Sequence, residues 1–242
     1  MVYNVKVKSF PTGLKQYFGH SKPVFSEYSR IPTKEKKIDS ARSKSVSQSR
    51  SKVNAYDLAL ANEWDYFLTG TFDRKVVNAY DYSCFVQYIL LFTQRLRDHN
   101  IQYLLVPEQH KDGAWHFHSL IKGILPLVLA YSPHTGCPLL DSSGRQIYNC
   151  PLYKYGFTTV TQVTDSIKSA GYICKYLTKA QDDVPKGKKR YWASRSLNRP
   201  TEDFIVVDNY SDFVETMKQK ADYTKETHTS EYGDFFFAEI KK

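Results

Sequence analysis

The stretch that decides the fold runs over residues 101–121 and reads I-Q-Y-L-L-V-P-E-Q-H-K-D-G-A-W-H-F-H-S-L-I. Its first part, Ile101–Glu108, is an apolar run of the length of a strand, and Trp115–Ile121 is a second such run. Between them lies Asp112-Gly113, a dipeptide typical of tight turns. The stretch therefore predicts a β-hairpin whose two strands pair in an antiparallel sheet.

The sequence on both sides of this hairpin supplies further strands and helices. Runs of aromatic and β-branched residues predict strands, and apolar residues spaced three and four apart predict helices. We expect strands at 66–72, 156–163 and 191–194, helices at 80–98 and 165–180, and an insertion of loops and short strands at 124–155. This order predicts an α+β fold in which helices cover one face of an antiparallel sheet.

The two ends of the chain carry weaker signals. Val2–Lys8 alternates apolar and polar residues and could be a short strand. A helix at 208–220 and strands at 223–227 and 234–240 are expected to form a small appended unit. The chain is thus divided into a basic, partly disordered arm at 1–55, a central domain at 56–200 and an acidic extension at 201–242.

The formal net charge of +9 is distributed unevenly. Residues 1–55 hold 12 Lys and Arg against 3 Asp and Glu, whereas residues 201–242 hold 5 against 10. Residues 40–51 read S-A-R-S-K-S-V-S-Q-S-R-S, which predicts a mobile arm that could become helical on DNA. Such an arm suits a polyanion partner, with a solvated tail as the alternative. Its candidate DNA-binding residues are Arg42, Lys44, Arg50 and Lys52.

Cysteine spacing and hydropathy exclude several classes of protein. No C-x-x-C pair occurs, which argues against a thiolate zinc site and a disulfide framework, so we expect free thiols. No apolar run approaches the about 18 residues of a membrane span. Lys6 and Lys8 interrupt any signal-peptide pattern, so we expect an intracellular, cytoplasmic protein. The four cysteines are Cys84, Cys137, Cys150 and Cys174.

The returning strand of the hairpin contains His116-Phe117-His118. Side chains alternate along a strand, so both imidazoles share one face and Phe117 points to the other. The hairpin brings Glu108 toward them as an oxygen ligand, and two nitrogens with one carboxylate suit a divalent ion with open positions. His110, at the turn, is the alternative third ligand. A single histidine would more often be a hydrogen-bonded structural residue.

The predicted helix at 165–180 contains Tyr172-Ile173-Cys174-Lys175-Tyr176-Leu177-Thr178-Lys179. Tyr172 and Tyr176 are four apart, as are Lys175 and Lys179, so each pair shares one helix face. A phenol becomes a good nucleophile only when a cation or metal stabilises its phenolate. Taken alone, the pattern favours an amphipathic helix that buries aromatics and exposes lysines.

In this order, the motifs resemble the HUH superfamily of rolling-circle replication initiators. F-L-T-G-T-F at 67–72 resembles its first motif, His116-Phe117-His118 its second and residues 172–176 its third. Two tyrosines four apart, with a lysine before the second, are similar to the branch of isometric single-stranded DNA phages and some plasmids. The resemblance covers about residues 62–200. The chain lacks a G-x-x-x-x-G-K-[ST] loop, so no fused helicase is expected.

The resemblance implies a five-stranded antiparallel sheet, related in shape to RNA-recognition modules, that carries Mg²⁺ or Mn²⁺. It implies a metal-dependent endonuclease and strand transferase acting on single-stranded origin DNA. A tyrosine attacks the phosphate, leaving a 5′-phosphotyrosine and a free 3′-OH that primes a host polymerase, and a host helicase is the other expected partner. The replicon would be a phage or plasmid in a bacterial cell.

Residue roles follow from the same resemblance. Tyr172 is assigned the first cleavage because it stands three residues before Lys175, and Tyr176 the second transfer. Lys175 and Lys179 would counter phenolate or phosphate charge. The strand near the site would be held by the basic residues Lys186, Lys188, Lys189, Arg190 and Arg195.

Two rival functions remain open at this stage. The first is a relaxase or single-tyrosine transposase, although relaxases commonly show a third histidine and such transposases need one tyrosine. The second is a non-catalytic binder of single-stranded nucleic acid whose aromatic residues stack on bases without cutting. The candidate stacking residues are Tyr66, Phe72, Trp115 and Phe157.

Overall fold

The computed structural model describes residues 1–25, 40–230 and 233–241. The chain divides into two compact units: a central unit of residues 39–198, and a terminal unit that combines residues 1–38 with residues 199–242. In the part of the chain that is described, no helix has both the length and the apolar character needed to cross a membrane. The mixed α+β class with antiparallel sheets is confirmed.

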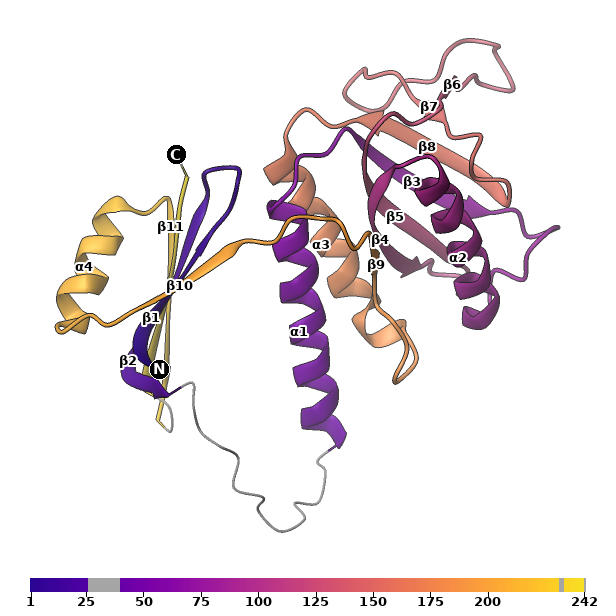
Figure 1. Ribbon diagram of the computed structural model, residues 1–242. Helices are drawn as coiled ribbons and strands as arrows, with labels where there is room; N and C mark the ends of the chain where they lie inside the picture. Colours follow the sequence, from indigo (N-terminus) through magenta and orange to yellow (C-terminus); the bar gives the residue numbers. More distant parts are fainter. Residues whose placement is uncertain (26–39, 231–232, 242) are drawn as a thin grey trace. The chain divides into compact units, whose positions relative to one another are not determined.

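The central unit is built on a seven-stranded sheet in which all paired strands are antiparallel (Figure 1). Four strands of seven or eight residues form its body, and three strands of two residues each extend it. The expected count of five is therefore wrong for this sheet, because the insertion at 124–155 adds two short strands beside β8. In spatial order the strands are β6 (Val128–Leu129), β7 (Tyr148–Asn149), β8 (Gly156–Gln162), β3 (Tyr66–Phe72), β5 (Trp115–Lys122), β4 (Gln102–Gln109) and β9 (Trp192–Ala193).

Helix α2 (Tyr82–Asp98) covers one face of this sheet. Asp81 caps its N-terminus by accepting a hydrogen bond from the Ser83 backbone N–H at 2.8 Å. Phe85, Ile89, Phe92 and Leu96 are buried along one side of the helix. The Phe92 ring lies 5.6 Å from that of Phe117, so α2 packs on the face to which Phe117 points.

Helix α3 (Ser166–Asp183) lies on the opposite face, where it contacts β4, β5 and helix α1 (Ser40–Leu60). Tyr176 of α3 stacks on His118, whose side chain points away from Phe117. The expectation that the helices share one face is therefore wrong. Strand β5 is buried from Trp115 to Ile121 because both of its faces are covered.

Strand register fixes which side chains meet above β5. In the β4–β5 hairpin Glu108 lies opposite His116, and from the other side Thr69 of β3 lies opposite His118. Gly70 lies opposite Phe117, and a Cβ atom there would fall 2.2 Å from Phe117 Cζ. The glycine in the first motif therefore makes room for the ring that anchors the histidine strand.

The terminal unit holds a five-stranded antiparallel sheet with helix α4 (Tyr210–Lys220) on one face. Its small core joins Val214 and Met217 of the helix to Phe236 and Ala238 of the sheet. In spatial order its strands are β10 (Thr201–Ile205), β1 (Val2–Ser9), β2 (Lys15–Phe25), β12 (Gly233–Ile240) and β11 (Tyr223–Thr229).

This arrangement differs from the expected arm, central domain and extension. The N-terminal residues belong to the same sheet as the C-terminal ones, since β1 pairs with both β2 and β10. The low-complexity stretch at 40–51 is the first half of α1, whose second half is anchored by the buried Ala55 and Leu58. Residues 26–39 of the expected arm lie outside the described residues.

Candidate metal centre and tyrosine pair

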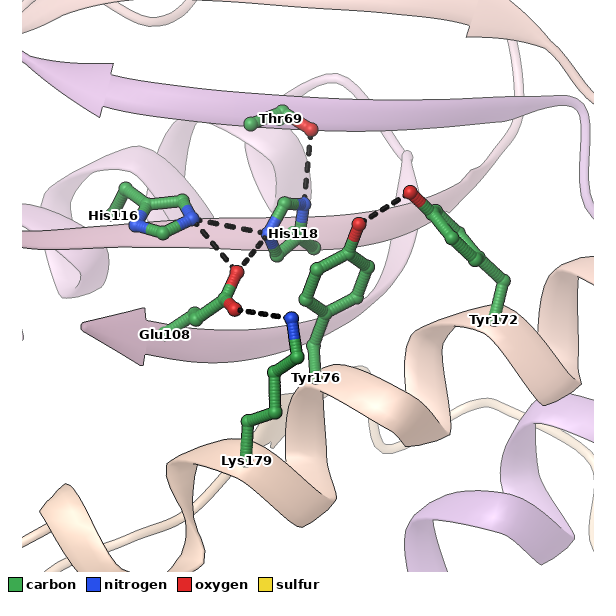
Figure 2. A network of polar contacts seen from close by, with 7 residues as sticks. All are labelled: Thr69, Glu108, His116, His118, Tyr172, Tyr176 and Lys179. Carbon is green, nitrogen blue, oxygen red and sulfur yellow. Dashed lines mark hydrogen bonds and ion pairs between the residues drawn. The ribbon is translucent and has the colours of Figure 1, made fainter. Parts of the chain in front are cut away.

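Glu108, His116 and His118 converge above the centre of the sheet; we call them the Glu–His–His cluster (Figure 2). Glu108 Oε2 lies 2.9 Å from His116 Nε2 and 2.8 Å from His118 Nε2. The two Nε2 atoms are 3.1 Å apart. Both histidines are buried and the Glu108 side chain is 13% exposed, so the three ligand atoms form a tight triangle in a largely shielded position.

The neighbours of the cluster orient its rings. Thr69 Oγ1 lies 3.0 Å from His118 Nδ1, so a hydrogen bond fixes this ring with Nε2 toward Glu108. The His110 ring stacks on His116 at 3.7 Å between centroids, but His110 is exposed and is not part of the cluster. Of the two expected choices for the third ligand, the structure therefore places Glu108 beside the histidines.

Burial controls the charge of the cluster. It lowers the pKa of His116 to about 4, with help from the repulsion of His118 and His110, and it lowers the pKa of His118. Burial of the Glu108 carboxyl opposes ionisation, but hydrogen bonds with His118 and Lys179 outweigh it, so the pKa of Glu108 is lowered. At neutral pH the cluster thus presents two neutral imidazoles and one carboxylate, the protonation states that bind cations.

The ligand atoms fit a divalent ion. Three ligands on one face of an octahedron with bonds of about 2.1 Å lie about 3.0 Å apart. The separations of 2.8, 2.9 and 3.1 Å match this spacing. Two imidazoles with one carboxylate are a donor set that first-row divalent ions accept, and three protein ligands leave positions for a substrate oxygen.

Helix α3 brings the tyrosine pair, Tyr172 and Tyr176, to the cluster (Figure 2). The Tyr176 ring stacks on His118 with centroids 3.5 Å apart, and its hydroxyl is hydrogen-bonded to that of Tyr172. The Phe67 ring lies 5.2 Å from Tyr172 and 6.4 Å from Tyr176. Tyr172 is 46% exposed, whereas burial and the hydrogen bond with Tyr172 raise the pKa of Tyr176. The two phenols thus stand in a row leading outward from the cluster.

The two lysines of the third motif differ in position. Lys179 Nζ lies 3.2 Å from Glu108 Oε1 and 5.4 Å from the centre of the Tyr176 ring. Lys175 is exposed, and the structure brings only Lys179 of the two to the cluster. The helix explains this difference, because Lys179 is one turn beyond Lys175 along α3.

The expected DNA-binding residues fall into exposed and buried groups. Arg190 is 7% exposed and its Nη1 lies 3.3 Å from Ser47 Oγ of α1, so it is a packed residue rather than an exposed contact for DNA. The side chain of Arg42 lies outside the described residues. The others are exposed: Lys44, Arg50 and Lys52 on α1, Lys186, Lys188 and Lys189 in the loop after α3, and Arg195.

A strip of the sheet beside the cluster is exposed over β8. Phe157 lies opposite Thr71, which in turn lies opposite His116, so all three side chains share the face of the cluster. Phe157 is 68% exposed. Of the other aromatics considered for base stacking, Phe72 and Trp115 are buried in the core and Tyr66 packs against it, so Phe157 is the one whose ring is open to a base.

Residues 65–181 match a family of replication-associated proteins, the one whose description begins with ORF2. The matched segment runs from β3 through the hairpin to α3, so it contains the whole Glu–His–His cluster, the tyrosine pair and Lys179. The match supports a replication initiator family and a role in DNA replication. No curated protein and no solved structure matches the chain.

Proposed function

We propose that this chain is a rolling-circle replication initiator, a metal-dependent nickase and strand transferase that joins itself to single-stranded origin DNA through a tyrosine. One observation carries the proposal: two tyrosine hydroxyls stand in a row beside a Glu–His–His cluster fit for a divalent ion. A nucleophile, a cation site and a nearby ammonium group are the components that phosphoryl transfer requires.

The chemistry exchanges one phosphodiester for another. The tyrosine oxygen forms a bond to the scissile phosphorus, and the bond from phosphorus to the 3′ oxygen breaks. The phenol loses its proton and the 3′ oxygen gains one, which leaves a 5′-phosphotyrosine and a free 3′-OH. Because the new bond is again a phosphodiester, the reverse reaction can rejoin a strand without an external energy source.

The residues around the cluster have separable tasks in this reaction. Glu108, His116 and His118 would hold Mg²⁺ or Mn²⁺, which supplies Lewis-acid polarisation of the phosphate when bound. Thr69 holds the His118 ring in orientation. Lys179, whose Nζ is near both Glu108 and Tyr176, would offset the negative charge of the phosphate.

The tyrosine pair supports a division of labour. Tyr172 has the more exposed ring and is assigned the first cleavage, and Tyr176 the second transfer, after one round of replication. The first tyrosine still carries DNA when the regenerated origin must be cut, so a second nucleophile is needed. Neighbouring hydroxyls on one helix meet this need, because each can reach the same phosphate after a small shift of α3.

DNA contacts would extend outward from this centre. Phe157 offers a stacking surface for a base beside the cluster, and the exposed lysines of the loop after α3 offer charge for the backbone. Lys44, Arg50 and Lys52 present further charge along α1. The polymerase that extends the 3′-OH and the helicase that unwinds the replicon would come from the bacterial host.

Nicking can be tested without knowledge of the origin sequence. We would incubate the protein with a library of single-stranded oligonucleotides that carry a randomised window, in Mn²⁺ or in EDTA. DNA retained on the protein after denaturation in SDS would then be sequenced. The proposal predicts retention of a defined sequence in Mn²⁺ and none in EDTA. Metal-independent binding with no retained DNA in either buffer would instead support the non-catalytic binder.

A further inference from the structure

The sheet of the terminal unit has a second face that α4 does not cover. The helix contacts β2, β11 and β12 and packs on Phe236 and Ala238. Side chains alternate along each strand, so the residues next to these two point to the opposite face. Among the described residues of this unit, α4 is the one helix, and it occupies one face alone.

The register places one continuous row of side chains across all five strands of this opposite face, which we call the aromatic face. Each member lies directly opposite the next in the strand pairing. Because neighbouring strands are about 4.8 Å apart, the row extends for about 19 Å. From β10 to β11 it consists of Phe204, Lys6, Phe18, Phe237 and Lys225.

Ring and ammonium groups alternate closely on this face. The Phe18 and Phe237 rings lie 5.2 Å apart. Lys6 Nζ lies 5.7 Å from the centre of the Phe204 ring, and Lys8 Nζ lies 5.6 Å from that of Phe18. Beyond the row, three further rings contact its members or one another, with centroids 4.7–6.1 Å apart: Tyr3 beside Phe204, Tyr223 beside Phe237, and His20 beside Phe235.

The rings are accessible rather than enclosed in a core. Phe204 and Tyr223 are exposed, and Phe18 and Phe237 are partly exposed. Large apolar side chains on an uncovered sheet face are unfavourable in water and mark a surface with a binding role. The core of the unit lies on the α4 side, so these rings are not required to fill it.

Charge separates the two faces of the unit. Lys6, Lys8 and Lys225 share the aromatic face with Glu202, which lies 2.6 Å from Lys6 Nζ, and with Glu239. The α4 side carries acidic groups: Glu226 and Asp234 on the sheet, and Asp212 and Glu215 on the helix. A polyanion would therefore be attracted to the aromatic face and repelled from the α4 side.

We propose that the aromatic face of the terminal unit binds single-stranded DNA, with bases stacked on its phenylalanine rings and phosphates beside its lysines. Flat rings interleaved with ammonium groups on an open sheet form a surface that accepts unpaired bases and excludes a rigid duplex. This is a second DNA site, separate from the Glu–His–His cluster. It rests on the proposed function only for the choice of DNA as the nucleic acid, and it requires no cleavage.

Binding is tested in the full chain with fluorescein-labelled oligothymidylate of about 20 nucleotides, in EDTA so that no cutting occurs. The variant Phe18→Leu/Phe204→Leu/Phe237→Leu keeps apolar bulk but removes the rings. We expect its affinity to fall by about tenfold or more. The control Phe213→Leu makes the same change on the α4 side, where Phe213 packs in the core, and should leave affinity unchanged. Equal affinities of the wild type and the triple variant would overturn the proposal.

A crosslinking measurement on the wild type avoids any dependence on the folding of the variant. Bromodeoxyuridine oligonucleotides are irradiated with the protein, and crosslinked peptides are mapped. Crosslinks to peptides that contain Phe18, Phe204 or Phe237 are expected, and crosslinks confined to residues 39–198 would refute the aromatic face as a site. Failure of nicking in Mn²⁺ would count against the proposed function alone, because neither measurement here involves cleavage.

Discussion

The two faces of strand β5 carry different kinds of residues from one and the same segment. On the α2 side, Phe117 is fully buried and packs against Phe92, with Gly70 making room for its ring. On the α3 side, His116 and His118 are also buried, yet they meet Glu108 and Tyr176 instead of apolar groups. Burial alone therefore does not mark a residue as part of the core: the partners on each face decide its task.

This contrast has an energetic consequence. Burying Phe117 stabilises the fold through apolar area and packing. Burying two imidazoles and a carboxylate costs free energy unless each polar atom finds a partner. His116 Nδ1 has no hydrogen-bond partner among the described residues, so the α3 side contains a polar group that packing does not satisfy. A polar cluster retained at this cost is typical of a functional site.

The largest expected effect is loss of chemistry without loss of the fold. His116→Ala/His118→Ala removes both nitrogen ligands, so nicking should fall by about 10³-fold or more. Mn²⁺ should raise the thermal unfolding midpoint of the wild type but not that of the variant. Single-stranded DNA binding in EDTA should persist. Normal cleavage by this variant would show that the cluster is not the metal centre.

The next effect separates the two tyrosines. Tyr172→Phe removes one hydroxyl and should strongly reduce the first nick, because the remaining nucleophile is the more buried phenol. Tyr176→Phe should still nick but fail to release closed circles. Product analysis on denaturing gels with a circular template distinguishes the two defects. If Tyr176→Phe releases circles at the normal rate, Tyr176 is a packing residue and one tyrosine performs all the chemistry.

A change on the opposite face should affect stability instead. Phe117→Ala leaves a cavity under α2 and should lower the free energy of unfolding by about 3–5 kcal/mol, measured by urea denaturation. Below the unfolding midpoint, the folded fraction should still bind Mn²⁺. A loss of Mn²⁺ affinity in variant protein that remains folded would show that the two faces are not separable.

The smallest effect is a pH dependence that belongs to the histidine face alone. The pKa of His116 in the folded chain, about 4, lies below the ordinary value of 6.5, so protonation favours the unfolded chain. In EDTA, stability should be retained above pH 6.5 and lost as the pH falls toward 4, by up to about 1.4 kcal/mol per pH unit. His116→Gln should flatten this dependence, whereas the exposed control His99→Gln should not. An identical slope in His116→Gln would exclude His116 as its source.

Local sequence pattern was sufficient for the cluster and insufficient for much of its surroundings. The alternation in His116-Phe117-His118 and the turn at Asp112-Gly113 predict which side chains meet, and the register confirms that Glu108 lies opposite His116. Alternation does not say which helix covers which face, so the position of α2 opposite α3 was missed. The same limit applies to Lys175 and Lys179, since the phase of α3 against the sheet selects between them.

Long-range pairing explains the remaining differences. Strands β2 and β10 have weak patterns of their own, and β10 pairs with β1 across almost the whole chain, as in Val5 opposite Ile205. Helix α1 has few apolar residues in its first half, so its sequence resembles a tail. Burial of Arg190 depends on its contact with Ser47 of this helix, and no local signal in the basic loop indicates it.

The central claim is tested most directly by the mass of the peptide that holds the DNA. After reaction with the retained oligonucleotide in Mn²⁺, the adduct is digested with nuclease and trypsin. Cleavage after Lys168, Lys175 and Lys179 separates the two tyrosines into peptides 169–175 and 176–179. We expect a nucleotide attached through phosphate to Tyr172 in the first turnover, and to Tyr176 as well after the second transfer. Cleaved DNA with no adduct on either peptide would contradict a tyrosine-linked mechanism.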